Sequence, residues 1–228
     1  MVLGGLQKLT LLDFPGHVAC TVFTLGCNFR CPFCHNTPLV LTADTPVYDT
    51  EEFFRFLEKR RGLIDGVAVT GGEPLLQKDI GEFLARIKAM GYAVKLDTNG
   101  AFPGVLKDLA ARGLVDYVAM DVKNAPEKYE TTAGCTGCLP AVEESVEFLL
   151  SGPVDYEFRT TAVAELHSEE DFRGIGRWIA GCRRYYIQQF TDSGDILAPG
   201  MTQPGDETMK KYLQAAREFV PAAELRGL

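Results

Sequence analysis

Long hydrophobic runs are missing from this sequence, since no segment approaches the roughly 20 apolar residues of a membrane-spanning helix. The N-terminal stretch also lacks a basic region followed by a long apolar segment, so we expect no signal peptide. Basic charge is scarce, because 23 lysines and arginines face 31 acidic residues and leave a net charge of −8. These absences argue against a membrane protein and against a general nucleic-acid-binding surface. We expect a cytoplasmic protein.

Repeats, low-complexity segments and long linkers are also absent. The 228 residues are enough to build one sizeable core, so we expect a single domain over residues 1–228. Disulfides are not expected either. The seven cysteines are an odd number, and in a reducing compartment cysteines are more often thiols or metal ligands.

Short apolar runs alternate with amphipathic stretches along the chain. The predicted strands cover 18–25, 66–70, 93–98, 117–122, 155–163 and 183–190. The predicted helices lie near 50–61, 76–90, 103–112, 140–151, 168–180 and 205–219. Thr50 and Ser168, each followed by acidic residues, are expected at helix starts. Such alternation implies an α/β fold of parallel βα units, either an open doubly wound sheet or a partial (β/α)6 barrel.

Polar motifs help to choose between these two architectures. They cover 26–36, 70–74, 97–99 and 121–123, each at the end of one of the first four predicted strands. In a barrel the carboxyl ends of all strands converge on one face. In an open sheet, ligands gather at a single switch point. Four successive strands with a polar end therefore favour the partial TIM barrel.

Three cysteines crowd into the loop "GCNFRCPFCHN", at Cys27, Cys31 and Cys34. Thiolates suit iron–sulfur clusters, zinc or copper(I). A closed zinc site needs four ligands, and His35 is an awkward fourth because it adjoins Cys34. A [4Fe–4S] cluster held by three cysteines keeps one iron open for another ligand. The spacing favours this cluster over zinc and over unligated thiols.

This Cys-x3-Cys-x2-Cys loop resembles the cluster loop of the radical S-adenosylmethionine (SAM) enzymes. The segment "TGGEP" (70–74), after the next predicted strand, resembles the SAM-binding Gly-Gly-Glu-Pro motif of that superfamily, here at 71–74. The opening "LTLLDFPGHVACTVFTLGCNFRCPFCHN" is similar to glycyl-radical-enzyme activating enzymes, most of all those of anaerobic ribonucleoside-triphosphate reductase. The resemblance spans nearly the whole chain, weakens after about residue 165, and implies a partial TIM barrel.

The resemblance implies a function as well as a fold. Cys27, Cys31 and Cys34 would hold a [4Fe–4S] cluster, and SAM would occupy its open iron. Reductive cleavage of SAM would then generate a glycyl radical on a partner enzyme, anaerobic ribonucleotide reductase, with a flavodoxin-type reductant. A pyruvate formate-lyase-type activating enzyme, or a small-molecule enzyme such as 7-carboxy-7-deazaguanine synthase, stays as an alternative. A plain iron–sulfur electron carrier would have no use for the Gly-Gly-Glu-Pro motif.

Further site residues follow from the resemblance and from strand alternation. Those expected to bind SAM are Phe33, Gly71, Gly72, Glu73, Pro74, Thr98, Asn99, Asp121, Lys123 and Arg159. A monovalent cation is expected near Asp97 and Asp121, and contact with the glycyl peptide at Asp13 and His35. Plainer interpretations stay open, namely an ordinary turn at 98–100 and a salt bridge at the barrel rim between Asp121 and Lys123.

Two groups of residues have no assigned role at this point. Gln188 and Gln189 stand where activating enzymes of this type often have a histidine. The remaining cysteines are Cys20, Cys135, Cys138 and Cys182, and the "GCTGC" segment contains a Cys-x2-Cys pair. An auxiliary metal site is one interpretation of these four cysteines. Buried thiols that act as small hydrophobes are the other.

Overall fold

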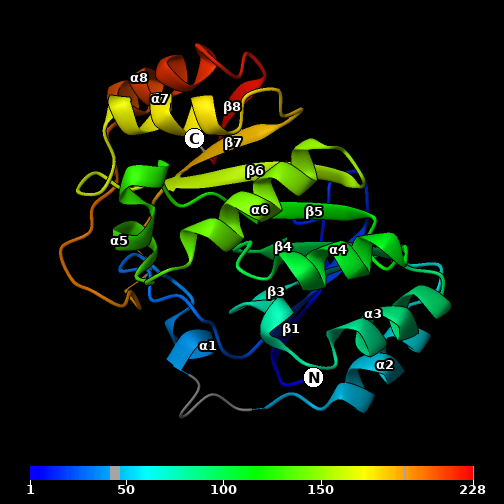
Figure 1. Ribbon diagram of the computed structural model, residues 1–228. Helices are drawn as coiled ribbons and strands as arrows, with labels where there is room; N and C mark the ends of the chain where they lie inside the picture. The colour runs from blue at the N-terminus through cyan, green and yellow to red at the C-terminus, as the bar shows by residue number, and fades with distance from the viewer. Residues whose placement is uncertain (42–46, 193, 228) are drawn as a thin grey trace.

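One eight-stranded sheet organises the computed structural model, which describes residues 1–41, 47–192 and 194–227 (Figure 1). The strands are β1 (Leu3–Thr10), β2 (Ala19–Thr24), β3 (Gly66–Gly71), β4 (Ala93–Thr98), β5 (Tyr117–Asp121), β6 (Asp155–Ala162), β7 (Tyr185–Gln189) and β8 (Ala223–Arg226). Their order in the sheet follows their order in the chain. β1 runs antiparallel to β2, and every later pair is parallel. The expected parallel α/β architecture is therefore confirmed.

All six predicted strands are present as β2 to β7, and two edge strands were missed. β1 carries several half-buried and exposed residues, so it has no apolar signal of its own and depends on its hairpin with β2. β8 has only four residues. Among the described residues β1 and β8 do not pair with each other, so they form the two edges of a partial barrel.

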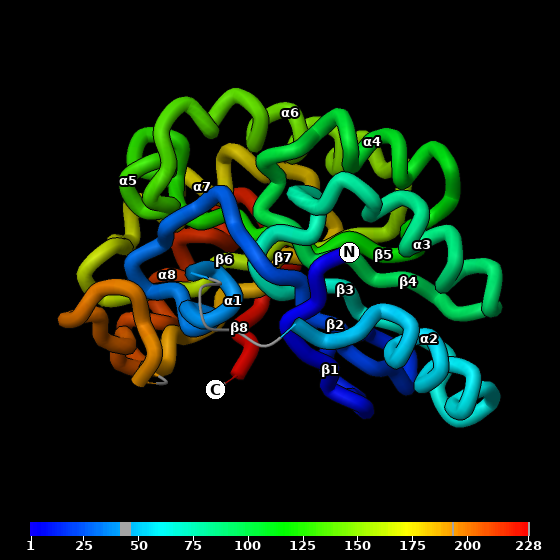
Figure 2. Tube along the Cα trace, turned by 90° about the horizontal axis from the view of Figure 1, so that it is seen from below, coloured from blue at the N-terminus to red at the C-terminus, as the bar shows by residue number. Residues whose placement is uncertain are grey.

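Helices cover the outer side of the sheet, where α4 and α6 lie in front of the strands in Figure 1 and α3 to α6 arc around them in Figure 2. The α-helices are α1 (Thr37–Leu41), α2 (Thr50–Lys59), α3 (Ile80–Ala89), α4 (Pro103–Ala111), α5 (Tyr129–Ala133), α6 (Leu139–Leu150), α7 (Glu169–Trp178) and α8 (Asp206–Arg217). Two short 3-10 helices are η1 (Pro74–Leu76) and η2 (Pro126–Lys128). No helix in the described ranges is long and apolar enough to cross a bilayer.

The predicted helix starts had different outcomes. Ser168 caps α7 in a capping box, because its side chain accepts from the Asp171 N–H while the Asp171 carboxylate accepts from the Ser168 N–H. The cap of α2 is Asp49 and not Thr50. The Asp49 carboxylate accepts a hydrogen bond from the Glu52 N–H at 2.6 Å. The prediction of acidic residues in the first turn of α2 was correct, but the capping residue lies one position earlier than predicted.

The hydrophobic core lies between the sheet and its helices, and it contains alternate strand residues such as Val67, Val69, Val94 and Leu96, all fully buried. The opposite strand face points into the barrel. It carries charged and polar side chains, among them the buried Lys95. The strands that looked uniformly apolar in the sequence therefore have one apolar face and one polar face.

Candidate active site

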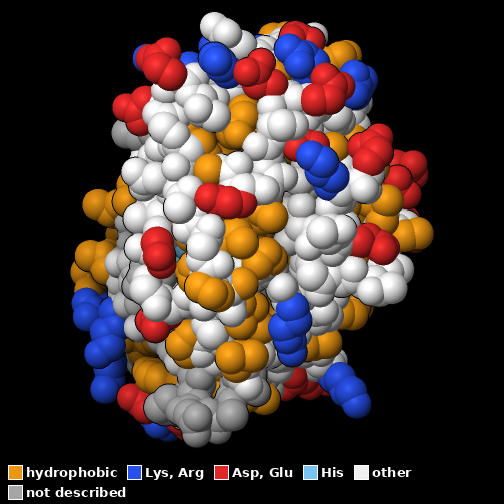
Figure 3. All heavy atoms as spheres, turned by 90° about the vertical axis from the view of Figure 1, so that its left-hand side faces the viewer, with side chains coloured by type: hydrophobic (Ala, Val, Ile, Leu, Met, Phe, Trp, Pro, Cys, Tyr) orange, Lys and Arg blue, Asp and Glu red, His pale blue; other side chains and the backbone are white. Residues whose placement is uncertain are grey.

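A cavity of about 250 Å³ opens at the carboxyl ends of the parallel strands. Figure 3 views the face toward which α1, α5 and the connection after β7 lie, and hydrophobic side chains gather at its middle. The cavity is lined by Cys27, Phe29, Cys31, Phe33, Cys34, His35, Asn36, Val40, Thr70, Gly71, Gly72, Asp97, Thr98, Asn99, Asp121, Lys123, Arg159, Thr161 and Gln188. Every one of the four polar motifs contributes to this cavity, as a barrel requires.

The three cysteines of the loop after β2 share the wall of this cavity. The loop folds on itself, because the Cys34 N–H donates to the Cys31 carbonyl at 3.1 Å and the Phe29 N–H lies 3.4 Å from the Cys27 sulfur. A closed zinc site needs four ligands, and this loop supplies three thiols. A [4Fe–4S] cluster takes each cysteine on a different iron, so three separate thiols around one cavity fit it.

Burial controls the protonation of these thiols. It raises the pKa of the Cys31 thiol to about 11, and the nearby Lys123 ammonium opposes this only in part. Burial also raises the pKa of Cys27. Both thiols therefore release a proton when they ligate a metal. The Asn99 side-chain N–H group lies 3.8 Å from the Cys27 sulfur and donates to the Asn28 side-chain oxygen (Oδ1) at 2.9 Å, so it is placed to donate to a cluster thiolate.

The glycines of the Gly-Gly-Glu-Pro motif press against the cysteine loop. The Gly72 N–H donates to the Thr24 carbonyl at 2.9 Å, and the next residue's N–H donates to the Gly26 carbonyl at 2.8 Å. A Cβ at position 72 would lie 2.0 Å from the Gly26 oxygen, which no side chain tolerates. Gly71 has φ +120°, and a Cβ there would lie 2.3 Å from the Thr24 nitrogen. Both glycines are therefore required for the two motifs to meet.

Glu73 and Pro74, both expected at the SAM site, are not among the residues that line the cavity. The Glu73 side chain is fully buried beneath the site. It accepts hydrogen bonds from the Asn99 N–H at 2.7 Å, the Thr98 hydroxyl at 2.7 Å and the Leu75 N–H at 3.0 Å. Glu73 therefore positions the residues that do line the cavity.

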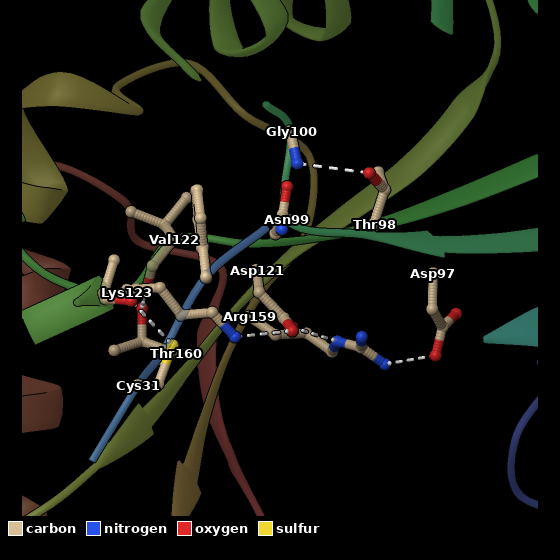
Figure 4. Close-up of polar contacts among 12 residues, drawn as sticks. Cys31, Asp97, Thr98, Asn99, Gly100, Asp121, Val122, Lys123, Arg159 and Thr160 are labelled. Atoms are coloured by element: carbon tan, nitrogen blue, oxygen red, sulfur yellow. Dashed lines mark hydrogen bonds and ion pairs between the residues drawn. The ribbon is translucent and has the colours of Figure 1, made fainter. Parts of the chain in front are cut away.

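An alternating chain of charges crosses the cavity floor (Figure 4). The Arg159 guanidinium bridges Asp121 at 3.0 Å and Asp97 at 3.1 Å, and Lys123 donates to the other Asp121 oxygen at 2.9 Å. Lys95, which is 2% exposed, forms an ion pair with Asp97 on the same strand. Lys95 is the residue that the sequence interpretation missed. Its signal was a lysine two residues before Asp97 in an apolar strand, which places both on one face.

These charges shift one another strongly. Although burial alone would raise it, Arg159 and Lys123 lower the pKa of Asp121 to about 2. Arg159 and Lys95 likewise overcome burial and lower the pKa of Asp97. Three cations thus face two carboxylates, which leaves one positive charge. The expected monovalent cation near Asp97 and Asp121 finds no support, because both carboxylates already have cationic partners.

The outer part of the cavity contains His35, Thr161 and Gln188. The His35 ring stacks on Phe190, with centroids 5.7 Å apart. Burial lowers the pKa of His35, and Lys123 lowers it further, so the imidazole is neutral at neutral pH. Asp13, which like His35 was expected to contact the glycyl peptide, is not among the lining residues. It lies in the β1–β2 connection and accepts a hydrogen bond from the Thr21 hydroxyl.

The connection from β7 to α8 closes one side of the cysteine loop. The Ala198 N–H donates to the Pro32 carbonyl at 2.9 Å, and the Thr37 hydroxyl donates to the Asp195 carbonyl at 2.5 Å. No motif marked this connection in the sequence. Only the fold places it against the loop that carries the cysteines.

The other four cysteines do not gather into one site. Cys20 and Cys182 are buried in the hydrophobic core. Cys135 and Cys138 form a disulfide with each other, between α5 and α6. The expectation that the chain has no disulfide was therefore wrong for this pair, whose closeness in the chain favours bonding. Cys20 and Cys182 therefore behave as small hydrophobes, as one of the two interpretations had it.

Known proteins resemble this chain along its sequence. The model of the radical SAM superfamily matches residues 21–167. A Methanocaldococcus jannaschii protein, provisionally assigned as a glycyl-radical enzyme activating enzyme, is 31% identical over the whole of this chain and 96% of its own length. The pyruvate formate-lyase-activating enzyme of Clostridium pasteurianum is 30% identical over 56% of each chain.

The fold is similar to that of solved structures as well. Streptococcus suis SuiB bound to S-adenosylmethionine superimposes with a TM-score of 0.70 at 12% sequence identity. The match covers 90% of this chain and 49% of SuiB. At this identity the similarity concerns the fold alone.

Proposed function

The chain belongs to the radical SAM superfamily, and we propose that it activates a glycyl radical enzyme by reductive cleavage of SAM. The observation that carries the proposal is that three thiols and a floor of charged side chains line one cavity at the carboxyl ends of the strands. The full-length similarity to an activating enzyme of provisional assignment supports the choice within the superfamily. The proposed partner is anaerobic ribonucleotide reductase, on the resemblance of the opening segment. A flavodoxin-type reductant and a cytoplasmic location belong to the same proposal.

Cys27, Cys31 and Cys34 would hold the [4Fe–4S] cluster. When bound, the cluster supplies the electron that cleaves SAM to methionine and a 5′-deoxyadenosyl radical, which removes a hydrogen atom from a glycine Cα of the partner. The protein has to position SAM and keep water away from the reacting atoms. Cys31 and Phe33 are buried, and the β7–α8 connection contacts the cysteine loop at Pro32, which suits that task.

Two cations on the cavity floor suit the SAM carboxylate. Lys123 and Arg159 line the cavity, and beyond their pairs with Asp121 and Asp97 they have further N–H groups that can donate to a carboxylate. The carboxylates keep the arginine in a fixed orientation, so little reorganisation is needed when the ligand binds. Phe33, which is 3% exposed, provides an apolar surface for the adenine.

His35 is proposed as the contact to the glycyl peptide, because it lines the cavity in neutral form and is held by the ring of Phe190. Asp13 is left out of this role, since it points to Thr21 and does not line the cavity. We expect His35→Ala to lower radical transfer to the partner more than SAM cleavage. Lys107→Ala, on the exposed side of α4, is the matched control.

The experiment that tests the function uses the full chain with its cluster reconstituted without oxygen. SAM, a low-potential reductant and purified glycyl radical enzymes are then added. A glycyl radical doublet in the electron paramagnetic resonance spectrum of the reductase is the expected result. A doublet only on pyruvate formate-lyase would change the partner. SAM cleavage without a radical on any of these proteins would overturn the proposal in favour of a small-molecule substrate, such as that of 7-carboxy-7-deazaguanine synthase.

A further inference from the structure

The Cys135–Cys138 pair has no place in the proposed function, yet it is the one bonded pair of cysteines in the described part of the chain. Both cysteines are half-buried, while Gly134, Thr136 and Gly137 around them are exposed. The pair therefore sits in a surface loop that an external thiol can reach. The position and exposure of this disulfide are typical of one that reacts with thiols, since disulfides that only stabilise a fold are usually protected from reductants.

The residues just before the pair pack directly on the cysteine loop of the active site. The Ala133 carbonyl accepts a hydrogen bond from the Arg30 N–H at 3.1 Å and lies 3.4 Å from the Cys31 sulfur. Gly134 follows in the left-handed region at φ +61°, and a Cβ there would lie 2.2 Å from the Arg30 oxygen. The Cys-x2-Cys segment is thus continuous with backbone in tight contact with a cluster ligand. A change in its conformation has a short path to Cys31.

The N-terminus of helix α6 makes the sulfurs of Cys135 and Cys138 differ in how well each is stabilised as a thiolate. Cys138 occupies the N-cap position of this 12-residue helix, and its carbonyl accepts from the Val142 N–H at 3.2 Å. A thiolate at a helix N-terminus is stabilised by the helix dipole. The Glu130 carboxylate, which accepts from the Leu139 N–H at 3.3 Å, opposes this in part. Cys135 lies before the helix and lacks the same stabilisation, so Cys138 is the better leaving group in exchange.

A metal site at this pair is not favoured. A zinc or iron–sulfur site needs at least one further thiolate, imidazole or carboxylate beside the two sulfurs. No such group of three exists among the residues that the structure describes. Cys20 and Cys182 are buried in the core. The chemistry left to the pair is thiol–disulfide exchange.

We propose that Cys135 and Cys138 form a thiol–disulfide exchange site for an external dithiol, and that its redox state is transmitted to the cluster loop through Ala133 and Gly134. A thiolate of the dithiol attacks the Cys135 sulfur, forms a mixed disulfide and releases the Cys138 thiolate. The second thiol of the reductant then closes its own disulfide and releases Cys135. Two electrons and two protons pass to the pair, and the dithiol is oxidised.

The exchange is tested on the full chain without its cluster, so that enzyme activity plays no part. The protein is equilibrated without oxygen in dithiothreitol buffers of stepped reduced-to-oxidised ratio, quenched with acid, and labelled with a maleimide. Peptide mass spectrometry should show Cys135 and Cys138 gaining label together across a narrow range of ratios. C135S and C138S should abolish that transition, and C182A should leave it unchanged. Equal labelling of the pair in every buffer, or pairing of either cysteine with Cys27, Cys31 or Cys34, would overturn the exchange site.

The transmission is tested on the reconstituted protein with the pair oxidised or reduced. Loss of cluster absorbance in the presence of an iron chelator should differ at least threefold between the two states. In the C135S/C138S double variant, one rate should be seen with and without the dithiol. Equal rates in the two states of the natural protein would overturn the coupling to the cluster loop. Neither readout uses a partner enzyme. The exchange test is independent of the proposed function, whereas the transmission test rests on the cluster that the proposed function assigns to Cys27, Cys31 and Cys34.

Discussion

The Glu73 carboxylate accepts a 2.7 Å hydrogen bond from the backbone N–H of Asn99, which ties the end of β3 to the end of β4. The same carboxylate holds the Thr98 hydroxyl. Asn99 in turn reaches the Cys27 sulfur. One fully buried side chain therefore connects the Gly-Gly-Glu-Pro turn, the residues that line the cavity and a cluster ligand. Its role is indirect, yet three parts of the site depend on it.

Glu73→Gln should weaken the site and the fold together. The amide replaces one acceptor oxygen by a donor that faces other donors, and an unsatisfied buried group costs about 1–3 kcal/mol. We expect a melting temperature lower by several degrees and a SAM dissociation constant higher by about tenfold. Calorimetry on the reconstituted protein measures both. Glu147→Gln, on the exposed side of α6, is the control. If Glu73→Gln changed the melting temperature and the SAM affinity no more than this control does, Glu73 would not have the supporting role described here.

Stability should also depend on pH through Glu73. Burial raises the pKa of this carboxyl to about 7, above its ordinary value of 4.5. A group whose pKa is raised in the folded state contributes stability below its unfolded pKa, and this contribution is lost as the pH rises through 7. The free energy of unfolding of the natural protein should therefore fall between pH 4.5 and 8 relative to Glu73→Gln, by roughly 3 kcal/mol. Urea unfolding at several pH values measures this free energy. If it changed with pH by the same amount in both proteins, the prediction would be refuted.

Gly72→Ala should displace the cysteine loop. The added Cβ would lie 2.0 Å from the Gly26 carbonyl oxygen, so one of the two backbones has to move. We expect iron content after reconstitution to fall by at least half and SAM binding to be lost. Gly104→Ala in α4 is the matched control, because a Cβ there meets nothing within 4 Å and alanine favours a helix. Normal iron content in Gly72→Ala would show that the loop adapts.

Stability and SAM affinity should both require the guanidinium group of Arg159 and not only its positive charge. Arg159→Ala leaves Asp97 and Asp121 without their shared partner, and removing one member of a buried ion pair costs about 3–5 kcal/mol. Arg159→Lys keeps the charge but cannot bridge two carboxylates with a rigid fork. We expect chemical denaturation to rank stability as natural protein, then lysine, then alanine, and SAM affinity to follow that order. Lysine equal to arginine in both measurements would mean that charge alone matters.

The cysteines should divide into two classes by metal content. Serine at Cys27, Cys31 or Cys34 should each abolish formation of an intact cluster, since each ligates a different iron. Alanine at Cys182, which is buried in the core, should leave iron and sulfide content unchanged. Chemical assays of iron and sulfide, with the absorption spectrum near 400 nm, measure this. Loss of the cluster in Cys182→Ala at normal folding would reveal a ligand that the structure does not indicate.

Local patterns in the sequence were enough for much of this protein. The strands β2 to β7 follow from short apolar runs, because each packs one apolar face on helices. The three-cysteine loop follows from its spacing, because a cluster demands thiolates close together in the chain. The Ser168 capping box is equally local. Gly71 and Gly72 were recognised by the resemblance of their motif, although the backbone that they contact, at Thr24 and Gly26, lies far away in the chain.

Relationships between distant segments were decided by the tertiary structure alone. Glu73 was expected near SAM, and its full burial beneath the site depends on how β3 and β4 pair. The Arg159 pairing with Asp97 joins β6 to β4 across β5, so it depends on how the sheet curves. His35 lines the cavity and Asp13 does not, a difference that no local pattern indicated. The contact of Ala133 with Cys31 spans 102 residues, and only the closing of the barrel brings such atoms together.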